Sequence, residues 1–216
     1  MPETRAHTQY RLADGTRVPS VTTVINELGW NKQALINWTR KTALAGEDPD
    51  KVRDEAADVG TLAHAMIHDY LAGEKTVDVS QWTPEQMRLA SQGYAAFVDW
   101  RRQVNFTLIA SELAITSEQF RYGGTIDMVA WVNLQLTICD FKTSAGVYPE
   151  HLAQVAAYQQ LYEEGLEPKG VKTKALIIQL DKNTGAFSAH PYANLDAARE
   201  VFMLCLRLHE LHKSVK

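Results

Sequence analysis

The chain has 216 residues, of which 45% are hydrophobic, and it carries a formal net charge of -4 at pH 7. This length and composition suit one structural domain with a substantial buried core. The acidic balance, with a pI near 6.0, excludes a surface that is basic along its whole length. Any contact with nucleic acid must therefore be confined to a local groove.

Cysteine content and hydropathy exclude further classes of protein. The two cysteines, Cys139 and Cys205, are too few for a disulfide framework or a four-cysteine iron–sulfur cluster, and we expect both to be buried thiols. No apolar run approaches the roughly 18 to 20 residues that a membrane span needs, and residues 1–15 contain no apolar export segment. We therefore expect a cytoplasmic protein with no iron–sulfur cluster and no membrane contact.

Helix start and stop signals recur through the first half of the chain. A capping side chain or a proline precedes each apolar pattern, and a glycine often follows it. After a hairpin over residues 10–20, these signals predict helices over residues 21–29, 32–46, 48–73 and 83–103. We therefore treat residues 1–105 as a helical N-terminal region.

The periodicity changes to that of strands from about residue 107. Alternating or apolar runs predict strands over residues 107–116, 123–132, 134–142, 173–181 and 186–192. Helices are predicted over residues 149–164 and 195–212. The fold class is therefore mixed α/β, with residues 106–216 forming a mixed central sheet flanked by helices. We expect this sheet core and the helical region to make one structural domain.

Two opposite charges, Asp140 and Lys142, end an otherwise apolar strand. Strand alternation puts both on its apolar face. A two-residue turn at 133–134 would place Asp127 of the preceding strand opposite Asp140, with Cβ atoms about 4.5 to 5.5 Å apart. Like charges at that separation require a cation. Leucine is unusual in such a turn, and a three-residue loop would shift the register. The alternative is a simple ion pair at the sheet rim, with Asp127 capping a turn.

Four short motifs follow one another along the chain: GTLAH at 60–64, GGTID at 123–127, DFKTS at 140–144 and QVAAY at 154–158. Together they resemble the PD-(D/E)xK nuclease superfamily, in the branch of RecB-type nuclease domains, Cas4 proteins, phage exonucleases and the mitochondrial genome maintenance exonuclease. The resemblance covers about residues 19–180. It implies a restriction-endonuclease-like core to which the helix carrying GTLAH also belongs.

The resemblance also implies a divalent metal site. Mg²⁺ prefers oxygen ligands, and Mn²⁺ also accepts histidine. The implied ligands are Asp127, Asp140, the backbone carbonyl of Phe141, and His64 as a further ligand or neighbour. Lys142 would hold the attacking water and the scissile phosphate. At position 68, family members often carry glutamate, whereas this chain has histidine. His68 could therefore contact a metal ligand, or this helix could provide no further metal contact. His64 and His68 are also spaced as a zinc-binding pair, although no third ligand is evident.

Further residues are implied as contacts to substrate. Gln154 and Tyr158 share a helical face, which is also typical of an ordinary helix covering a sheet, and the resemblance places them over the active site with Thr143 and Ser144. Glu112 would make a supporting contact or is a solvated edge charge. On the N-terminal helices, Trp38 and Lys41 are suited to stacking bases and tracking phosphates, or to ordinary helix packing.

The sequence thus predicts a Mg²⁺- or Mn²⁺-dependent DNA exonuclease of the phage recombination or replication type. Its substrate would be single-stranded DNA or duplex ends, its partner a recombination or single-strand-binding protein, and its location the bacterial host cytoplasm. The alternative is a non-catalytic DNA-binding or assembly module that retains the fold. A hydrolase of small phosphate esters would be expected to carry a glycine-rich phosphate loop, which this sequence lacks.

Overall fold

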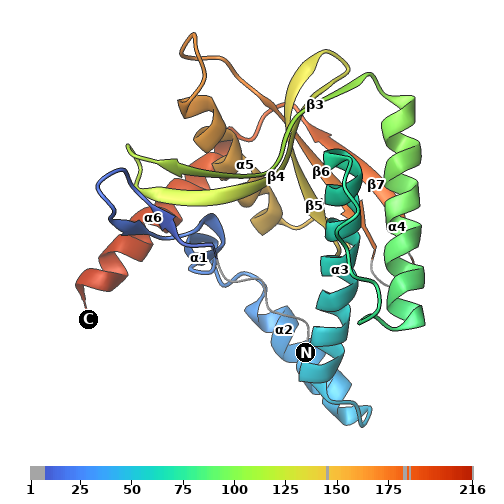
Figure 1. Ribbon diagram of the computed structural model, residues 1–216. Coiled ribbons are helices and arrows are strands. Elements are labelled where there is room, and N and C mark those ends of the chain that lie inside the picture. The colour runs from blue at the N-terminus through green and yellow to red at the C-terminus, as the bar shows by residue number, and fades with distance from the viewer. Residues whose placement is uncertain (1–7, 145, 182–183, 185, 216) are drawn as a thin grey trace.

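The computed structural model describes residues 8–144, 146–181, 184 and 186–215 (Figure 1). The strands are β1 (Tyr10–Arg11), β2 (Arg17–Val18), β3 (Phe106–Ser117), β4 (Tyr122–Val132), β5 (Gln135–Lys142), β6 (Lys174–Leu180) and β7 (Phe187–Tyr192). The helices are α1 (Val21–Ile25), α2 (Lys32–Leu44), α3 (Pro49–Ala72), α4 (Pro84–Gln103), α5 (Pro149–Glu164) and α6 (Asp196–Ser214). The predicted mixed α/β class is confirmed.

Capping explains where the long N-terminal helices begin and end. The Asp48 side chain accepts hydrogen bonds from the first turn of α3, and Gly73 ends that helix with a φ of 71°. Thr83 and Gln86 form a reciprocal capping box at the start of α4. The prediction of a helix as far as residue 29 was wrong, because α1 ends at Ile25. All five residues of α1 are β-branched, which lowers helix propensity.

The main sheet has the strand order β3-β4-β5-β6-β7. Among the strand pairs of this sheet that the structure describes, only β5–β6 is parallel, and helix α5 forms the connection between these two strands. Strands β4, β5 and β6 are central and are buried over most of their length. Asp140 thus lies in a strand that has both faces covered.

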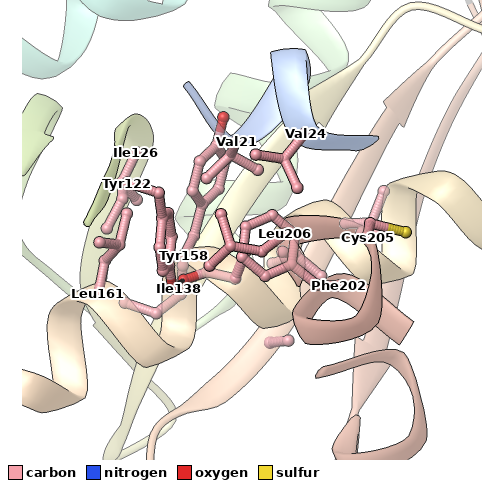
Figure 2. Packing of buried hydrophobic residues seen from close by; sticks show 14 of the residues in the cluster. Val21, Val24, Tyr122, Ile126, Ile138, Tyr158, Leu161, Phe202, Cys205 and Leu206 are labelled. Atoms are coloured by element: carbon pink, nitrogen blue, oxygen red, sulfur yellow. Dashed lines mark hydrogen bonds between the residues drawn. The ribbon is translucent and has the colours of Figure 1, made fainter. Parts of the chain in front are cut away.

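Helices cover the two faces of the sheet in separate groups. Helices α1, α5 and α6 pack on one face around Tyr122, Ile138 and Phe202, and Figure 2 shows this cluster. Helices α3 and α4 pack on the other face against Cys139 and Phe141. Both cysteines are buried and free, as predicted. Among the described residues, no helix is long and apolar enough to cross a membrane.

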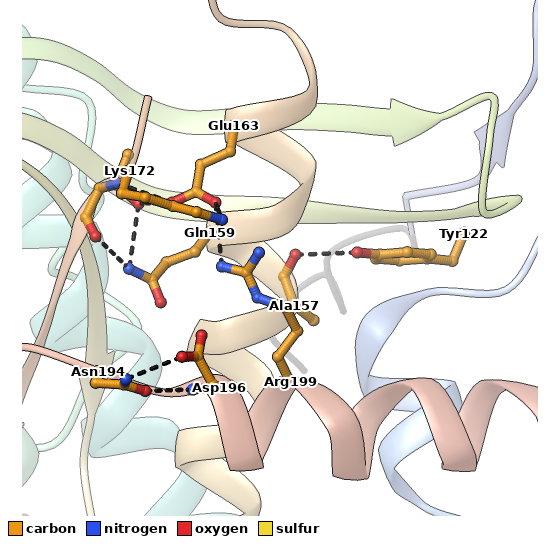
Figure 3. A network of polar contacts seen from close by, with 9 residues as sticks. Tyr122, Ala157, Gln159, Glu163, Lys172, Asn194, Asp196 and Arg199 are labelled. Carbon is orange, nitrogen blue, oxygen red and sulfur yellow. Dashed lines mark hydrogen bonds and ion pairs between the residues drawn. The ribbon is translucent and has the colours of Figure 1, made fainter. Parts of the chain in front are cut away.

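A partly buried polar network ties α5 to α6 and to the residues just before β6 (Figure 3). The Glu163 carboxylate accepts a hydrogen bond of 2.8 Å from the backbone N–H of Thr173 and pairs with Arg199 at 3.1 Å and Lys172 at 3.2 Å. The Gln159 amide donates to the Thr173 carbonyl oxygen at 2.8 Å. These contacts fix α5 over the sheet, where its other residues reach the site described next.

Candidate active site

A two-residue turn sets the register of the β4–β5 hairpin. Val132 pairs with Gln135, and the ladder continues to Met128 and Cys139. The turn residues Asn133 and Leu134 both have positive φ, 49° and 65°, which suits the right-handed twist of a hairpin. One position beyond the ladder, Asp127 lies opposite Asp140, so the predicted register is confirmed.

The two acids occupy different positions at the hairpin end. The Asp127 Oδ2 atom accepts a hydrogen bond of 2.7 Å from the backbone N–H of Phe141. Asp140 is only 1% exposed. Its Oδ2 lies 2.5 Å from the Lys142 Nζ atom, but within the described part of the chain it accepts no hydrogen bond of regular geometry. Asp140 is therefore a buried carboxylate whose charge is balanced mainly by one ammonium group.

Burial raises the pKa of Asp140 to about 6, and the negative charge of Asp127 adds to the effect. The positive charge of Lys142 opposes the rise, as does the neighbouring His64 ring. Because a second cation would stabilise the ionised forms of both acids, these two carboxylates together favour cation binding. Asp127, Lys142 and His64 all lie close enough to influence the Asp140 carboxylate. The structure therefore brings these four predicted residues together.

Helix α3 lies against the end of β5. The His64 and Phe141 rings meet edge to face with centroids 5.6 Å apart. One turn earlier, Gly60 faces Thr143, and a Cβ at Gly60 would lie 3.2 Å from the Thr143 Cβ and nearer still to its hydroxyl oxygen. The absent side chain lets the helix approach the strand that carries Asp140.

The next turn of α3 stabilises the loop that follows the helix. The Asp69 carboxylate accepts hydrogen bonds from the backbone N–H groups of Thr76 and Val77, at 2.6 and 2.9 Å. It therefore orders the loop after α3. The His68 Nδ1 atom is buried and has no hydrogen-bond partner among the described residues.

Helix α5 covers the site from the other face of the sheet. The Gln154 side chain donates a hydrogen bond of 2.9 Å to the Tyr158 hydroxyl oxygen. The Tyr158 ring is buried, and a Cβ at Gly124 would lie 2.6 Å from its Cε1 atom. Burial raises the pKa of Tyr158 well above its usual value, and the charges of Asp140 and Asp127 add to this. The phenol therefore stays protonated beside the acids.

Other predicted residues lie differently. The Ser144 hydroxyl donates to the carbonyl oxygen of Gly146 at 2.6 Å, while the Ser144 carbonyl oxygen accepts from Gln179 at 2.9 Å. Trp38 and Lys41 are exposed on α2, which extends away from the sheet beside α3 in Figure 1. Their roles in substrate binding stay predictions.

Glu112 has an unusual backbone conformation within β3. Its φ is 51°, although such conformations cost a non-glycine residue about 1 to 3 kcal/mol. The pairs on either side, Ser111 with Met128 and Leu113 with Ile126, place it opposite Asp127. Residues held in this conformation often belong to functional sites, so its supporting role remains open as a prediction.

Two residues that the sequence analysis did not select lie next to these groups. The Tyr10 hydroxyl is 2.8 Å from the Thr125 Oγ1 atom, two residues before Asp127. Burial, together with the positive charge of Lys142, lowers the pKa of His151 to about 4. The neutral His151 ring accepts a 3.2 Å hydrogen bond at Nδ1 from the Tyr148 backbone. Only its spacing from Gln154, one helical turn away, could have indicated His151 from the sequence.

The donor chemistry fits a hard divalent cation. Across the described residues, no group of three or more His, Cys, Asp or Glu side chains is arranged to hold a metal ion. Of the two carboxylates, Asp127 is bonded to the Phe141 N–H and Asp140 is paired with Lys142. Mg²⁺ needs only one or two carboxylates, because water and substrate phosphate complete its shell. The buried Asp140 oxygen without a regular hydrogen bond is suited to such an ion.

Comparison with known proteins places these residues in a family context. The family model described as the PD-(D/E)XK nuclease superfamily matches residues 33–212. Among solved structures, the crystal structure of LHK-Exo in complex with dAMP is 13% identical, with a TM-score of 0.43. That alignment covers 74% of this chain and 87% of the other. No curated protein matches the chain.

Proposed function

Because the chain belongs to the PD-(D/E)XK nuclease superfamily, we propose that it is a metal-dependent deoxyribonuclease that hydrolyses phosphodiester bonds. The observation that carries the proposal is the grouping of Asp127, Asp140 and Lys142 at one end of the β4–β5 hairpin. Two acids and an ammonium group provide a cation site and a phosphate contact at the same point.

Each residue has a distinct part in the proposed reaction. Asp127, Asp140 and the Phe141 carbonyl oxygen would hold Mg²⁺ or Mn²⁺, with His64 as a further ligand or neighbour. When bound, the ion supplies Lewis acidity and lowers the pKa of a coordinated water. Lys142 would turn from Asp140 toward the scissile phosphate and hold the attacking water beside it.

Helices α3 and α5 would complete the phosphate environment. The Gln154 amide lies next to the Tyr158 hydroxyl group and can donate its remaining N–H to a phosphate oxygen. The Thr143 hydroxyl, at the end of β5, can donate to a neighbouring oxygen. The buried Tyr158 ring would keep this wall rigid, because its neutral phenol adds no charge beside the acids.

We further propose that the enzyme acts from DNA ends, on single strands or on duplex termini. The exposed aromatic and cationic side chains of α2 support this proposal, because Trp38 and Lys41 lie on a helix that extends from the body beside α3. Aromatic faces stack on bases and lysines follow phosphates in single-strand channels. A free end passing along such a helix would favour exonuclease action.

Oligonucleotides that are labelled and blocked separately at each end test this function. The protein would be incubated with single-stranded and duplex substrates in Mg²⁺, Mn²⁺ or EDTA. We expect metal-dependent shortening from an open end, abolished by Lys142→Ala and retained by Lys51→Ala, which removes an exposed lysine from α3. DNA binding without cleavage in either metal would instead identify a non-catalytic module.

A further inference from the structure

A cleft of about 660 Å³, which neither Asp127 nor Asp140 lines, lies between elements that are distant in sequence. Its walls are the β1–β2 hairpin, the first residues of α1 and the last turns of α6. Figure 1 shows these N-terminal and C-terminal segments side by side. The cleft is therefore formed only when both ends of the fold are in place.

The cleft is cationic although the chain is acidic overall. Arg17 and Lys213 line it, and both also line an adjoining cavity of about 200 Å³ together with Arg121. In the part of the chain that the structure describes, neither Arg17 nor Lys213 forms an ion pair with a carboxylate. These two charges are therefore free to meet an anion from solution.

The nearby acids are engaged with other residues. The Glu27 carboxylate lies 2.8 Å from the His209 Nδ1 atom. Glu210, which lines the smaller cavity, pairs with Arg207 at 3.3 Å. These pairs leave the positive charge of the cleft largely unopposed.

Hydroxyl groups accompany the cations. Ser20, Thr22 and Thr23 line the same cleft at the start of α1. Arginine, lysine, serine and threonine are the side chains that contact phosphate and sugar oxygens in nucleic-acid complexes, and such contacts carry no base specificity. The cleft therefore has the chemistry of a site for the sugar–phosphate backbone.

The cleft adjoins the candidate active site through Tyr10. This side chain lines the cleft, and its hydroxyl lies 2.8 Å from the Thr125 Oγ1 atom on the strand that carries Asp127. A backbone hydrogen bond of 3.0 Å from Gly123 to Pro19 also fixes the cleft wall to the start of that strand. The wall of the cleft is therefore attached to the strand that carries Asp127.

We propose that this cleft binds the sugar–phosphate backbone of the DNA strand adjacent to the scissile phosphate, with Arg17 and Lys213 as its phosphate contacts. The proposal rests on the function proposed above. An acidic peptide would meet the same charges, but the connection through Tyr10 and Thr125 favours the nuclease substrate.

The test measures DNA binding separately from cleavage. Within a Lys142→Ala parent, a labelled single-stranded oligonucleotide is titrated by fluorescence anisotropy at several salt concentrations. The Arg17→Ala/Lys213→Ala variant is compared with Lys75→Ala/Arg102→Ala, which removes two exposed charges elsewhere. Thermal unfolding of each variant confirms that both remain folded.

We expect the cleft variant to raise Kd about tenfold or more at low salt and to reduce the salt slope by about 1.4, the value for two lost phosphate contacts on a single strand. The control variant should match the parent. In the active protein, the cleft substitutions should raise KM and leave kcat within about twofold.

Equal Kd values and salt slopes for the cleft variant, the control and the parent would overturn the cleft assignment while leaving the nuclease proposal intact. Tighter binding of an acidic peptide than of DNA, lost with Arg17 and Lys213, would overturn it in favour of a protein partner. Failure of the parent and the active protein to bind any DNA would overturn both proposals together.

Discussion

The Asp127 carboxylate accepts a hydrogen bond of 2.7 Å from the backbone N–H of Phe141, the residue that follows Asp140. The β4–β5 ladder ends one step earlier, at Met128 and Cys139. The side chain therefore extends the link between the strands beyond their backbone pairing. Because of this bond, Asp127, the proposed cation ligand, also positions the strand segment that carries the neighbouring acid.

Substitutions at Asp127 should separate these two roles. In Asp127→Asn the amide oxygen can still accept from Phe141, so we expect stability to change by less than about 1 kcal/mol while cleavage falls about 100-fold or more with the lost charge. Asp127→Ala should lose the same activity and a further ~1 kcal/mol of stability. Cleavage rates and urea unfolding measure the two effects. An asparagine variant with more than half of the activity would contradict the cation role.

The contact between Gly60 and Thr143 predicts a distant effect on activity. Gly60→Ala should gain up to ~1 kcal/mol of helix propensity, which offsets much of the steric cost of pushing Thr143 away. Stability should therefore change little, whereas cleavage should fall about tenfold or more because the end of β5 moves. Adding Thr143→Ala removes the hydroxyl oxygen, which is the nearest atom to the new Cβ, and should relieve most of this steric cost.

A matched glycine provides the control for this prediction. A Cβ at Gly93, in α4, would lie 3.5 Å from Leu180, which is an ordinary contact. Gly93→Ala should therefore stabilise the helix without changing cleavage. Equal activity in the Gly60 and Gly93 variants would show that the approach of α3 to β5 has no effect on the site.

The part of the site that the sequence predicted is the part governed by local pattern. Strand alternation and a short turn were enough to place Asp127 opposite Asp140, and these rules act between neighbours in the chain. Tyr10 and Thr125 meet across 115 residues. Their contact depends on how the β1–β2 hairpin packs against β4. No sequence periodicity predicts such a tertiary contact.

The helix ends also differ in how well the sequence predicted them. Both ends of α3 and the start of α4 follow capping residues that lie beside them in sequence, whereas α1 is shorter than its pattern indicated. The sequence also did not predict the hydrogen bond from the Phe141 N–H to the Asp127 carboxylate. A side chain can replace a backbone partner only where the strands separate, and alternation alone does not reveal that point.

The β4–β5 turn predicts a stabilising substitution. Leu134 has a φ of 65° and is 79% exposed, so its side chain gains little burial in return for a strained backbone. Leu134→Gly should raise the unfolding free energy by about 0.5 to 1 kcal/mol without changing cleavage. Leu134→Ala keeps a Cβ at positive φ and should not stabilise. Equal stability of the glycine and alanine variants would show that backbone strain at this turn is negligible.

The Glu163 network makes stability depend on pH. Burial by itself raises the pKa of Glu163, but the hydrogen bond from the Thr173 N–H and the positive charge of Arg199 outweigh it, and the net pKa lies below the ordinary value of 4.5. For a carboxyl group with a lowered folded-state pKa, the stabilisation is complete above the unfolded-state pKa and is lost as pH falls through the folded-state value. The Glu163 contribution to stability is therefore lost over a pH range that begins near 4.5 and extends to lower pH.

Glu163→Gln should reveal that pH range. The amide oxygen can still accept from the Thr173 N–H, but the pairing with Arg199 and Lys172 loses its charge, so the variant should be less stable than the parent at pH 7. Between about pH 5 and pH 3 its stability should fall less steeply than that of the parent, because it has no carboxyl group to protonate there. Urea unfolding at a series of pH values measures both effects, and Glu55→Gln, an exposed position on α3, controls for the change in net charge. Parallel pH profiles for the parent and Glu163→Gln would show that this carboxylate does not link proton binding to folding.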